Sequence, residues 1–144
     1  MKHLIPSISL VALCLASCAG PEPTSKTGAD APIQSRQVVG DWNDLQPAAD
    51  LGASRGRVAP LNETAGILED GRKTMTFQFL ASDDRQFLLI ATQANRGSGE
   101  STPGPIDLVV RGNPYRDAAR ERAILDGAAS RLKQLAGKDW APIR

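Results

Sequence analysis

Two spacings in the chain match catalytic motifs by residue type. Gly52-Ala53-Ser54-Arg55-Gly56 fits the G-x-S-x-G pattern, in which a serine on a sharp turn attacks an acyl carbon. That chemistry needs a buried strand before the serine and a histidine to take its proton, but Asp50-Leu51-Gly52 precedes Ser54. Ser130-Arg131-Leu132-Lys133 fits S-x-x-K, but it lies deep in an expected helix and no S-D-N companion is present. We therefore assign no catalytic residue.

The N-terminal segment has the pattern of an export signal. A short basic start is followed by an apolar run from Leu4 to Leu15. A helix that crosses a bilayer needs about 20 apolar residues, so this run is too short to be a permanent anchor. Leu15-Ala16-Ser17-Cys18 resembles the lipobox of bacterial lipoproteins, whereas the competing Cys14 follows a bulky leucine. The resemblance implies cleavage before Cys18 and lipid attachment to it; the alternative is an ordinary secretory signal that contains a cysteine.

The same resemblance gives an expected location. In lipoproteins of double-membrane bacteria, an aspartate after the lipidated cysteine commonly retains the protein at the inner membrane, and here that residue is Ala19. We expect an outer-membrane anchor with the domain facing the periplasm. In a single-membrane host the domain would face the cell exterior.

Cleavage would also limit the chemistry of the mature chain. His3 is the only histidine, and the two cysteines are Cys14, which would be removed, and Cys18, which would carry lipid. Imidazole bases, thiolate nucleophiles, disulfides and Cys/His zinc sites are then excluded, and carboxylate chemistry and calcium sites with oxygen ligands are left. We expect no cofactor and no metal. Asp83-Asp84, the densest carboxylate pair, is typical of a polar turn.

Charge balance argues against a nucleic-acid partner. The chain has 17 basic and 16 acidic residues, and the segment 1–17 contains only one of them, Lys2, so 16 of each would be left. A protein that binds nucleic acid would show a clustered basic excess. We interpret the arginines of the C-terminal segment as a solvated helix face: Arg116, Arg120, Arg122 and Arg131.

The composition divides the chain into three parts. Residues 1–17 would be the signal peptide. The segment 19–36 has three prolines, two glycines and little to bury, so residues 18–36 are expected to be the lipidated cysteine and a disordered tether. Residues 37–144 are expected to form a single domain.

Hydropathy patterns within that domain predict four antiparallel strands. Residues 65–69 and 73–80 flank Asp70-Gly71, which favours a type I′ hairpin turn. Residues 86–92 are apolar on both faces, typical of a central strand, and residues 106–111 alternate. The intervening segment 95–105 is rich in Gly, Ser, Thr and Pro, and we interpret it as an exposed connector.

Two helices are expected. Asp44 could cap a short helix that extends toward Ser54. The stronger one has Asn113 as its cap and Pro114 at its first position, and it ends near Ala136. Its apolar stripe comprises Tyr115, Ala118, Leu125, Ala128, Leu132 and Leu135, with a gap at Arg122. Trp140, past the helix end, is expected to fold back over the sheet edge.

These elements predict an α+β fold, a two-layer sandwich of a roughly four-stranded antiparallel sheet covered by one long C-terminal helix. Met75, Phe77, Phe79, Leu108 and Val110 would meet Leu125, Leu132 and Leu135. Leu88, Ile90 and Val109 would point to the opposite face, where either the segment 42–54 or another protein covers them. They form the candidate interaction surface, because exposed apolar patches mark partner sites.

Gly40-Asp41-Trp42-Asn43-Asp44 resembles a G-D-W-N-D stretch near the start of the folded domain in lipoprotein activators of penicillin-binding proteins. The resemblance covers five residues; those proteins continue with Thr-Asp and a long helix, whereas Leu45-Gln46-Pro47 follows here. The expected function is a membrane-anchored envelope lipoprotein with a non-catalytic domain that binds or scaffolds an envelope protein. The alternatives are a small carboxylate-dependent enzyme acting on cell-wall or glycan material, and an activator of a cell-wall synthase.

Overall fold

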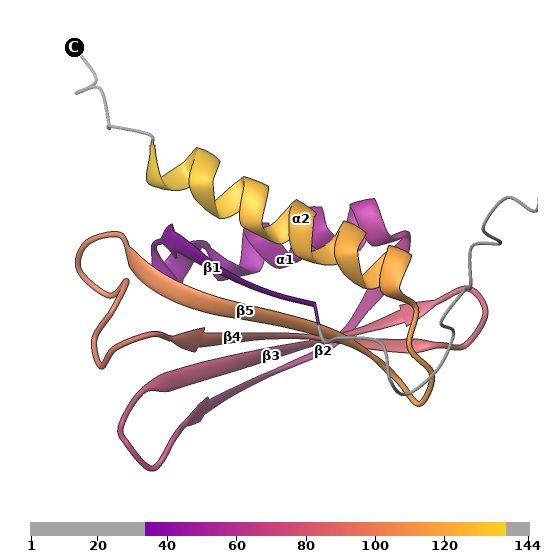
Figure 1. Cartoon of the computed structure of the whole chain (residues 1–144), viewed down its shortest axis with the longest axis horizontal. Coiled ribbons are helices and arrows are strands. Elements are labelled where there is room, and N and C mark those ends of the chain that lie inside the picture. The colour runs from indigo at the N-terminus through magenta and orange to yellow at the C-terminus, as the bar shows by residue number, and fades with distance from the viewer. Residues whose placement is uncertain (1–33, 138–144) are drawn as a thin grey trace, which may run out of the picture.

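A five-stranded antiparallel sheet carries two helices on one of its faces (Figure 1). The computed structural model describes residues 34–137. In chain order the elements are β1 (Gln34–Gly40), the 3-10 turn η1 (Trp42–Asp44), α1 (Leu45–Gly56), β2 (Val58–Ile67), β3 (Lys73–Ala81), β4 (Gln86–Gln93), β5 (Gly104–Asn113) and α2 (Ala118–Ala136). The strand order is β1-β5-β4-β3-β2, so β4 is the central strand, as its apolar pattern predicts.

The predicted α+β class, the antiparallel sheet and the C-terminal helix are confirmed, and the expected helix after Asp44 is present as α1. The prediction of four strands is incomplete because β1 forms a fifth, and β1 begins at Gln34, inside the segment that we predicted to be tether. Only Val38 and Gly40 of β1 are buried, so the strand needs few apolar residues and its sequence shows little alternation of apolar and polar residues. The predictions for Cys18, Ala19 and Trp140 fall outside the described residues.

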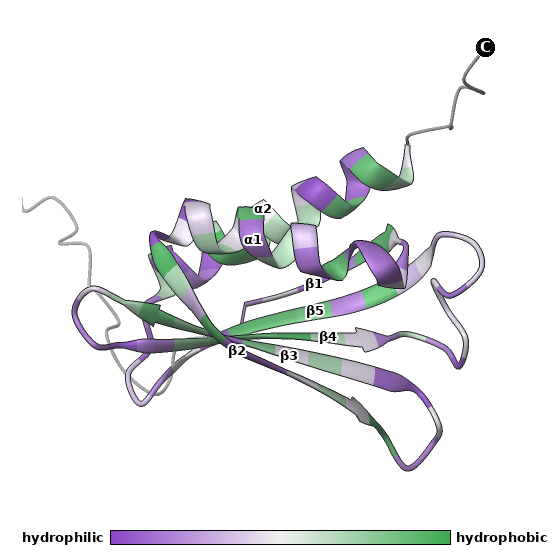
Figure 2. Cartoon of the chain, turned by 180° about the vertical axis from the view of Figure 1, so that it is seen from behind, coloured by the Kyte–Doolittle hydropathy of each residue, from purple (hydrophilic) through white to green (hydrophobic). Residues whose placement is uncertain are grey.

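The hydrophobic core lies between the sheet and the two helices, and alternate residues along β3, β4 and β5 contribute to it. Side chains on one face of the sheet are buried against the helices, and Figure 2 shows the apolar residues along the strands and along the helix sides that face them. The strands contribute Val38, Phe77, Phe79, Ala81, Phe87, Leu89, Ala91, Ile106, Leu108 and Val110, and the helices contribute Leu45, Ala48, Ala49, Ala53, Ile124, Leu125, Ala128, Ala129 and Leu132. Met75 packs at the edge of this core.

Glycines allow the two helices to approach closely. A Cβ atom on Gly127 of α2 would lie 2.8 Å from Gly52 Cα of α1, and one on Gly52 would lie 2.8 Å from the Ile124 carbonyl oxygen. A Cβ on Gly56 would lie within 3.0 Å of the Ile124 side chain. Gly52 and Gly56 are the glycines of the G-x-S-x-G pattern, and the structure places both on a helix that packs against another helix, not on a strand-to-helix elbow.

Arg57, the residue after Gly56, has a backbone conformation that is unusual for a residue other than glycine. Arg57 ends α1 with φ 54°, in the left-handed region where helices commonly place glycine. Its side chain is exposed. We expect Arg57→Gly to raise the free energy of unfolding by about 0.5–1 kcal/mol, because glycine adopts this conformation without a Cβ clash. Urea denaturation measures the change, and an unchanged or lowered midpoint would contradict it.

Both tight hairpins use the same three-residue loop. In the β2–β3 loop, Leu68 N donates to Arg72 O at 2.8 Å and Gly71 N donates to Leu68 O at 2.9 Å. Gly71 has a φ of 83°, whereas Asp70 does not have a positive φ, so the predicted type I′ turn is wrong. The β3–β4 loop repeats this pattern, with Asp84 at φ 60° in the place of Gly71. Asp83-Asp84 is therefore a polar turn, as predicted.

The start of α2 also differs from the prediction. Asn113 still belongs to β5, where it pairs with Gln86, and the helix begins at Ala118. Its cap is Asp117, whose carboxylate accepts a hydrogen bond from Arg120 N at 3.1 Å. The segment 114–117 is needed to carry the chain from the sheet to the helix layer. Tyr115 is therefore not part of the helix stripe, and the residue is 73% exposed.

Candidate interaction surface

Strand register defines the face of the sheet that is opposite the helices, which we call the outer face. Residues that are paired across an antiparallel ladder point to the same side. The middle row across the sheet consists of Ser35, Val109, Ile90, Thr76 and Thr64. On one side of it lies the row Gln37, Asp107, Thr92, Thr74 and Gly66, and on the other lies the row Arg111, Leu88, Gln78 and Asn62.

The three residues of the candidate interaction surface are neighbours on this outer face. Ile90 is directly paired with Val109, and Leu88 is the next residue of β4 on the same face. All three side chains are half-buried. They form an apolar centre on β4 and β5, with threonine, glutamine and asparagine side chains on β3 and β2 beside it.

Neither helix covers the outer face. Leu45, Ala48 and Ala53 of α1 belong to the same buried core as α2, so both helices lie on the inner side of the sheet (Figures 1 and 2). Of the two alternatives for covering Leu88 and Ile90, coverage by the segment 42–54 is therefore wrong. Within residues 34–137, nothing is packed over the centre of the outer face.

The outer face carries few charges. Among the strand residues of its three rows, Asp107 and Arg111 are the only ionised side chains. They lie on β5 at two residues before and two residues after Val109. Gln37 Nε2 donates to Asp107 Oδ1 at 2.8 Å, and Arg111 is exposed. The second carboxylate oxygen of Asp107 and the guanidinium of Arg111 can each take a partner of opposite charge.

No family model, curated protein or solved structure matches the chain.

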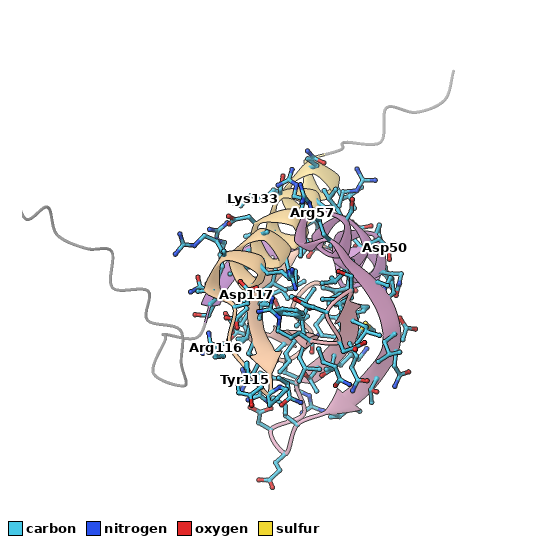
Figure 3. The ribbon with its side chains drawn as sticks, turned by 90° about the vertical axis from the view of Figure 1, so that its right-hand side faces the viewer. Asp50, Arg57, Tyr115, Arg116, Asp117 and Lys133 are labelled. Carbon is cyan, nitrogen blue, oxygen red and sulfur yellow. The ribbon has the colours of Figure 1, made fainter. Side chains whose placement is uncertain are left out.

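The most deeply buried charge in residues 34–137 has a structural role. The Glu121 side chain is fully buried and accepts hydrogen bonds from Gly112 N at 2.8 Å, Asp117 N at 3.2 Å and Arg116 Nε at 2.7 Å. Figure 3 shows Arg116 and Asp117 in the connection between β5 and α2. Burial alone would raise the pKa of Glu121, but the Arg116 hydrogen bonds, the backbone amides and the Arg116 charge together hold it below its usual value. A carboxylate held ionised in this way is not suited to be a general acid.

Arg116 was predicted to belong to a solvated helix face, and that prediction is wrong. It precedes α2, its side chain is 11% exposed, and it forms a salt bridge with Glu121. The missing signal lies in the helix stripe. Ala118, Leu125 and Ala128 lie on the buried face of the helix. Position 121 is three residues after Ala118 and four before Leu125, so the helical spacing puts it on the same face and predicts that Glu121 is buried.

A second ionic cluster joins the β3–β4 hairpin to the start of α2. Asp83 pairs with Arg85 at 2.6 Å and with Arg120 at 3.2 Å, and Arg85 also reaches Asp117 at 3.1 Å. The Arg85 hydrogen bonds, together with the charges of both arginines, lower the pKa of Asp83 to about 2. Arg120 also lies 5.5 Å from the ring centre of Phe87. These contacts orient the hairpin against the helix, and they keep Asp83 ionised at neutral pH.

The loop between β4 and β5 is held at several points. Gln93 is fully buried; its side-chain amide donates to Ser98 O at 2.9 Å and its side-chain oxygen accepts from Lys73 N at 2.9 Å. Trp42 N donates to Gly99 O at 2.7 Å. The segment predicted as an exposed connector thus fixes η1 beside the sheet, and its last two residues belong to β5.

A hollow of about 290 Å³ between α1 and the β2–β3 ladder has Asp50 and Glu63 among its lining residues. Both acids are exposed. A glycosidase-type general acid lies instead in an apolar pocket. The part of the chain that the structure describes contains no group of three or more His, Cys, Asp or Glu residues placed to hold a metal. It also contains no helix with the length and apolar character to cross a bilayer.

Proposed function

We propose that the chain is a membrane-anchored envelope lipoprotein whose domain binds a protein through the outer face of its sheet. The observation that carries this proposal is the one-sided packing of the fold. Both helices cover the inner face, while Leu88, Ile90 and Val109 lie half-buried at the centre of the other. An apolar centre with a polar rim is the usual composition of a protein-binding surface.

The lipobox resemblance at residues 15–18 supports the anchor. The residues from Cys18 to the start of β1 at Gln34 would then connect the lipid to the domain. If these residues form the disordered tether that their composition predicts, their root-mean-square span would be roughly 20 Å, which is enough to bring the sheet away from the lipid headgroups. A tether of this reach lets the outer face meet a partner in the same membrane or in the adjacent space.

Site-specific photo-crosslinking in cells tests both parts of the proposal. A photoreactive residue in place of Gln78, on the outer face, should give crosslinked protein products, and one in place of the exposed Gln134 on α2 should not. The Cys18→Ala variant should leave the membrane fraction. Crosslinking from Gln134 but not from Gln78 would contradict the assignment of the surface, and a membrane-bound Cys18→Ala variant would contradict the lipid anchor.

Ile90→Glu should abolish the products formed from Gln78 while the domain stays folded. The new carboxylate would be desolvated in the complex but can reach water in the free domain, because Ile90 is only half-buried there. Ala119→Glu, at an exposed position of α2, is the matched control and should leave the products unchanged. Circular dichroism reports the fold, and unfolding by Ile90→Glu would show that the outer face is core and would overturn the prediction.

A further inference from the structure

We infer that the protein bound at the outer face is a second copy of this chain, related to the first by a two-fold axis that crosses β5 at Val109. This inference rests on the proposed function, since it names the partner of the same surface. A two-fold interface places one patch against itself, so the patch must be self-complementary. Two features make the outer face self-complementary: the positions of Asp107 and Arg111, and the uncharged residues in its three rows.

The two charges lie symmetrically about Val109. Asp107 and Arg111 are each two residues from it on one strand, which is about 7 Å on either side. A two-fold axis in the plane of the interface and perpendicular to the strands inverts the strand direction. It therefore brings Asp107 of each copy to Arg111 of the other. An axis parallel to β5 would instead put like charges together, so the charges select the first arrangement.

Sheet twist leaves this pairing within reach. Two sheets packed face to face are rotated by about 30° relative to each other. At about 7 Å from the axis, that rotation displaces the paired positions by roughly 3–4 Å, which is less than the length of an arginine side chain. Gln37 occupies only one carboxylate oxygen of Asp107, and the other is free to accept from Arg111 of the second copy.

The uncharged positions fit the same axis. Residues of the middle row would each face their own counterpart, and none of them is charged, so no like-charge contact results. Val109 and Ile90 would form the apolar centre of the contact. The row that contains Asp107 would face the row that contains Arg111, so that Thr92 meets Leu88 and Thr74 meets Gln78. These contacts contain no buried charge without a partner.

The size of the face indicates the strength of the dimer. Five strands about 4.8 Å apart, each about 25 Å long, present roughly 600 Å² per copy. Standard interfaces bury about 800 Å² per partner, so the contact is at the small end, and we expect a micromolar dissociation constant. Lipid anchors in one membrane would raise the effective concentration of the two copies and favour the dimer.

Charge reversal tests the inference. The full-length chain, solubilised in mild detergent, is followed by sedimentation velocity over a range of concentrations. Asp107→Arg and Arg111→Asp should each weaken dimerisation at least ten-fold, because each brings two pairs of like charges together. The double variant Asp107→Arg/Arg111→Asp should return the dissociation constant to within about three-fold of the original. Arg122→Asp, at an exposed position of α2, should leave it unchanged.

Three results would overturn the inference: a chain that stays monomeric up to about 1 mM, a dimer that tolerates both single reversals, or a double variant no tighter than the single ones. Asp107→Asn and Arg111→Gln serve as milder variants if a reversal disturbs folding, and each should weaken the dimer. A monomeric chain that still forms crosslinks from Gln78 to a different protein would leave the proposed function intact. Absence of outer-face crosslinks together with a dimer insensitive to reversal would overturn both proposals.

Discussion

Glu121→Ala should lower the free energy of unfolding by about 3–5 kcal/mol, the usual cost of removing one member of a buried ion pair. The carboxylate is the shared acceptor for Gly112 N, Asp117 N and the Arg116 guanidinium, and each of these groups would lose its hydrogen bond to Glu121. Arg116, whose side chain is 11% exposed, would also lose its salt bridge with Glu121. Because domains of this size are stabilised by about 5–15 kcal/mol in total, the variant should be close to unfolding at 37 °C.

Urea denaturation at pH 7 measures this loss. Glu121→Gln keeps one acceptor for the Gly112 amide but removes the charge, so its loss should be smaller than that of Glu121→Ala. Glu69→Ala is the matched control, because Glu69 is exposed in the β2–β3 loop and should change stability by less than about 0.5 kcal/mol. Equal stability of Glu121→Ala and Glu69→Ala would contradict the role assigned to the buried carboxylate.

The same pair predicts a pH dependence. The pKa of Glu121 is lowered in the folded protein from its usual value of 4.5, so the unfolded chain binds the proton more readily. The stabilisation is therefore complete above about pH 4.5 and is lost as the pH falls through the folded pKa. The difference in urea midpoint between the native chain and Glu121→Gln should shrink below pH 4.5. A difference that stays constant down to pH 3 would contradict this.

Gly127→Val should lower the free energy of unfolding by about 2–3 kcal/mol, because it adds volume where the helices meet. The Cβ atom alone would lie 2.8 Å from Gly52 Cα and 2.9 Å from the Leu51 carbonyl oxygen, so the backbones of α1 and α2 must separate. The gain in helix propensity over glycine, below about 1 kcal/mol, is too small to offset this strain. Gly127→Ala should show the same effect at a smaller size.

Thermal and urea unfolding measure the cost, and Gly137→Ala is the control. Gly137 ends α2 at φ −88°, which any residue can adopt, and the nearest atom to an added Cβ is 3.5 Å away. That variant should be within about 0.5 kcal/mol of the original chain. If Gly127→Val were equally stable, the close approach of the helices would not be needed for the fold.

Much of the sheet could be predicted because the alternation of apolar and polar residues along a strand indicates which of its faces is buried. Phe77 and Phe79 face the helices and Leu88 and Ile90 face outward, as their spacing indicates. Edge strand β1 escaped prediction because only two of its residues are buried. The start of α2 was misplaced because Asn113 and Pro114 fit a helix start locally, whereas the distance from the sheet to the helix layer is a tertiary constraint.

The candidate surface was predictable in part. Alternation along β4 and β5 places Leu88, Ile90 and Val109 on one face, but it does not relate residues on different strands. The register between β4 and β5 decides which residues lie side by side on this face. It pairs Val109 with Ile90 and puts Asp107 and Arg111 in the rows on either side of them. The burial of Glu121 was missed because a run of alternating charges is typical of a solvated helix, and only the gap in the apolar stripe indicated otherwise.

The position of β1 has a consequence for how the domain is made. Within residues 34–137, β1 is the first strand in sequence, yet it pairs only with β5, the last of the five strands, with Val38 paired to Ile106. A ribosome or a translocation channel releases β1 first, and this strand must wait for nearly the whole domain before it can pair. Closing so long a loop is slow compared with forming the β2–β3 and β3–β4 hairpins. The order of strands thus delays completion of the sheet until synthesis or export of the domain is almost finished.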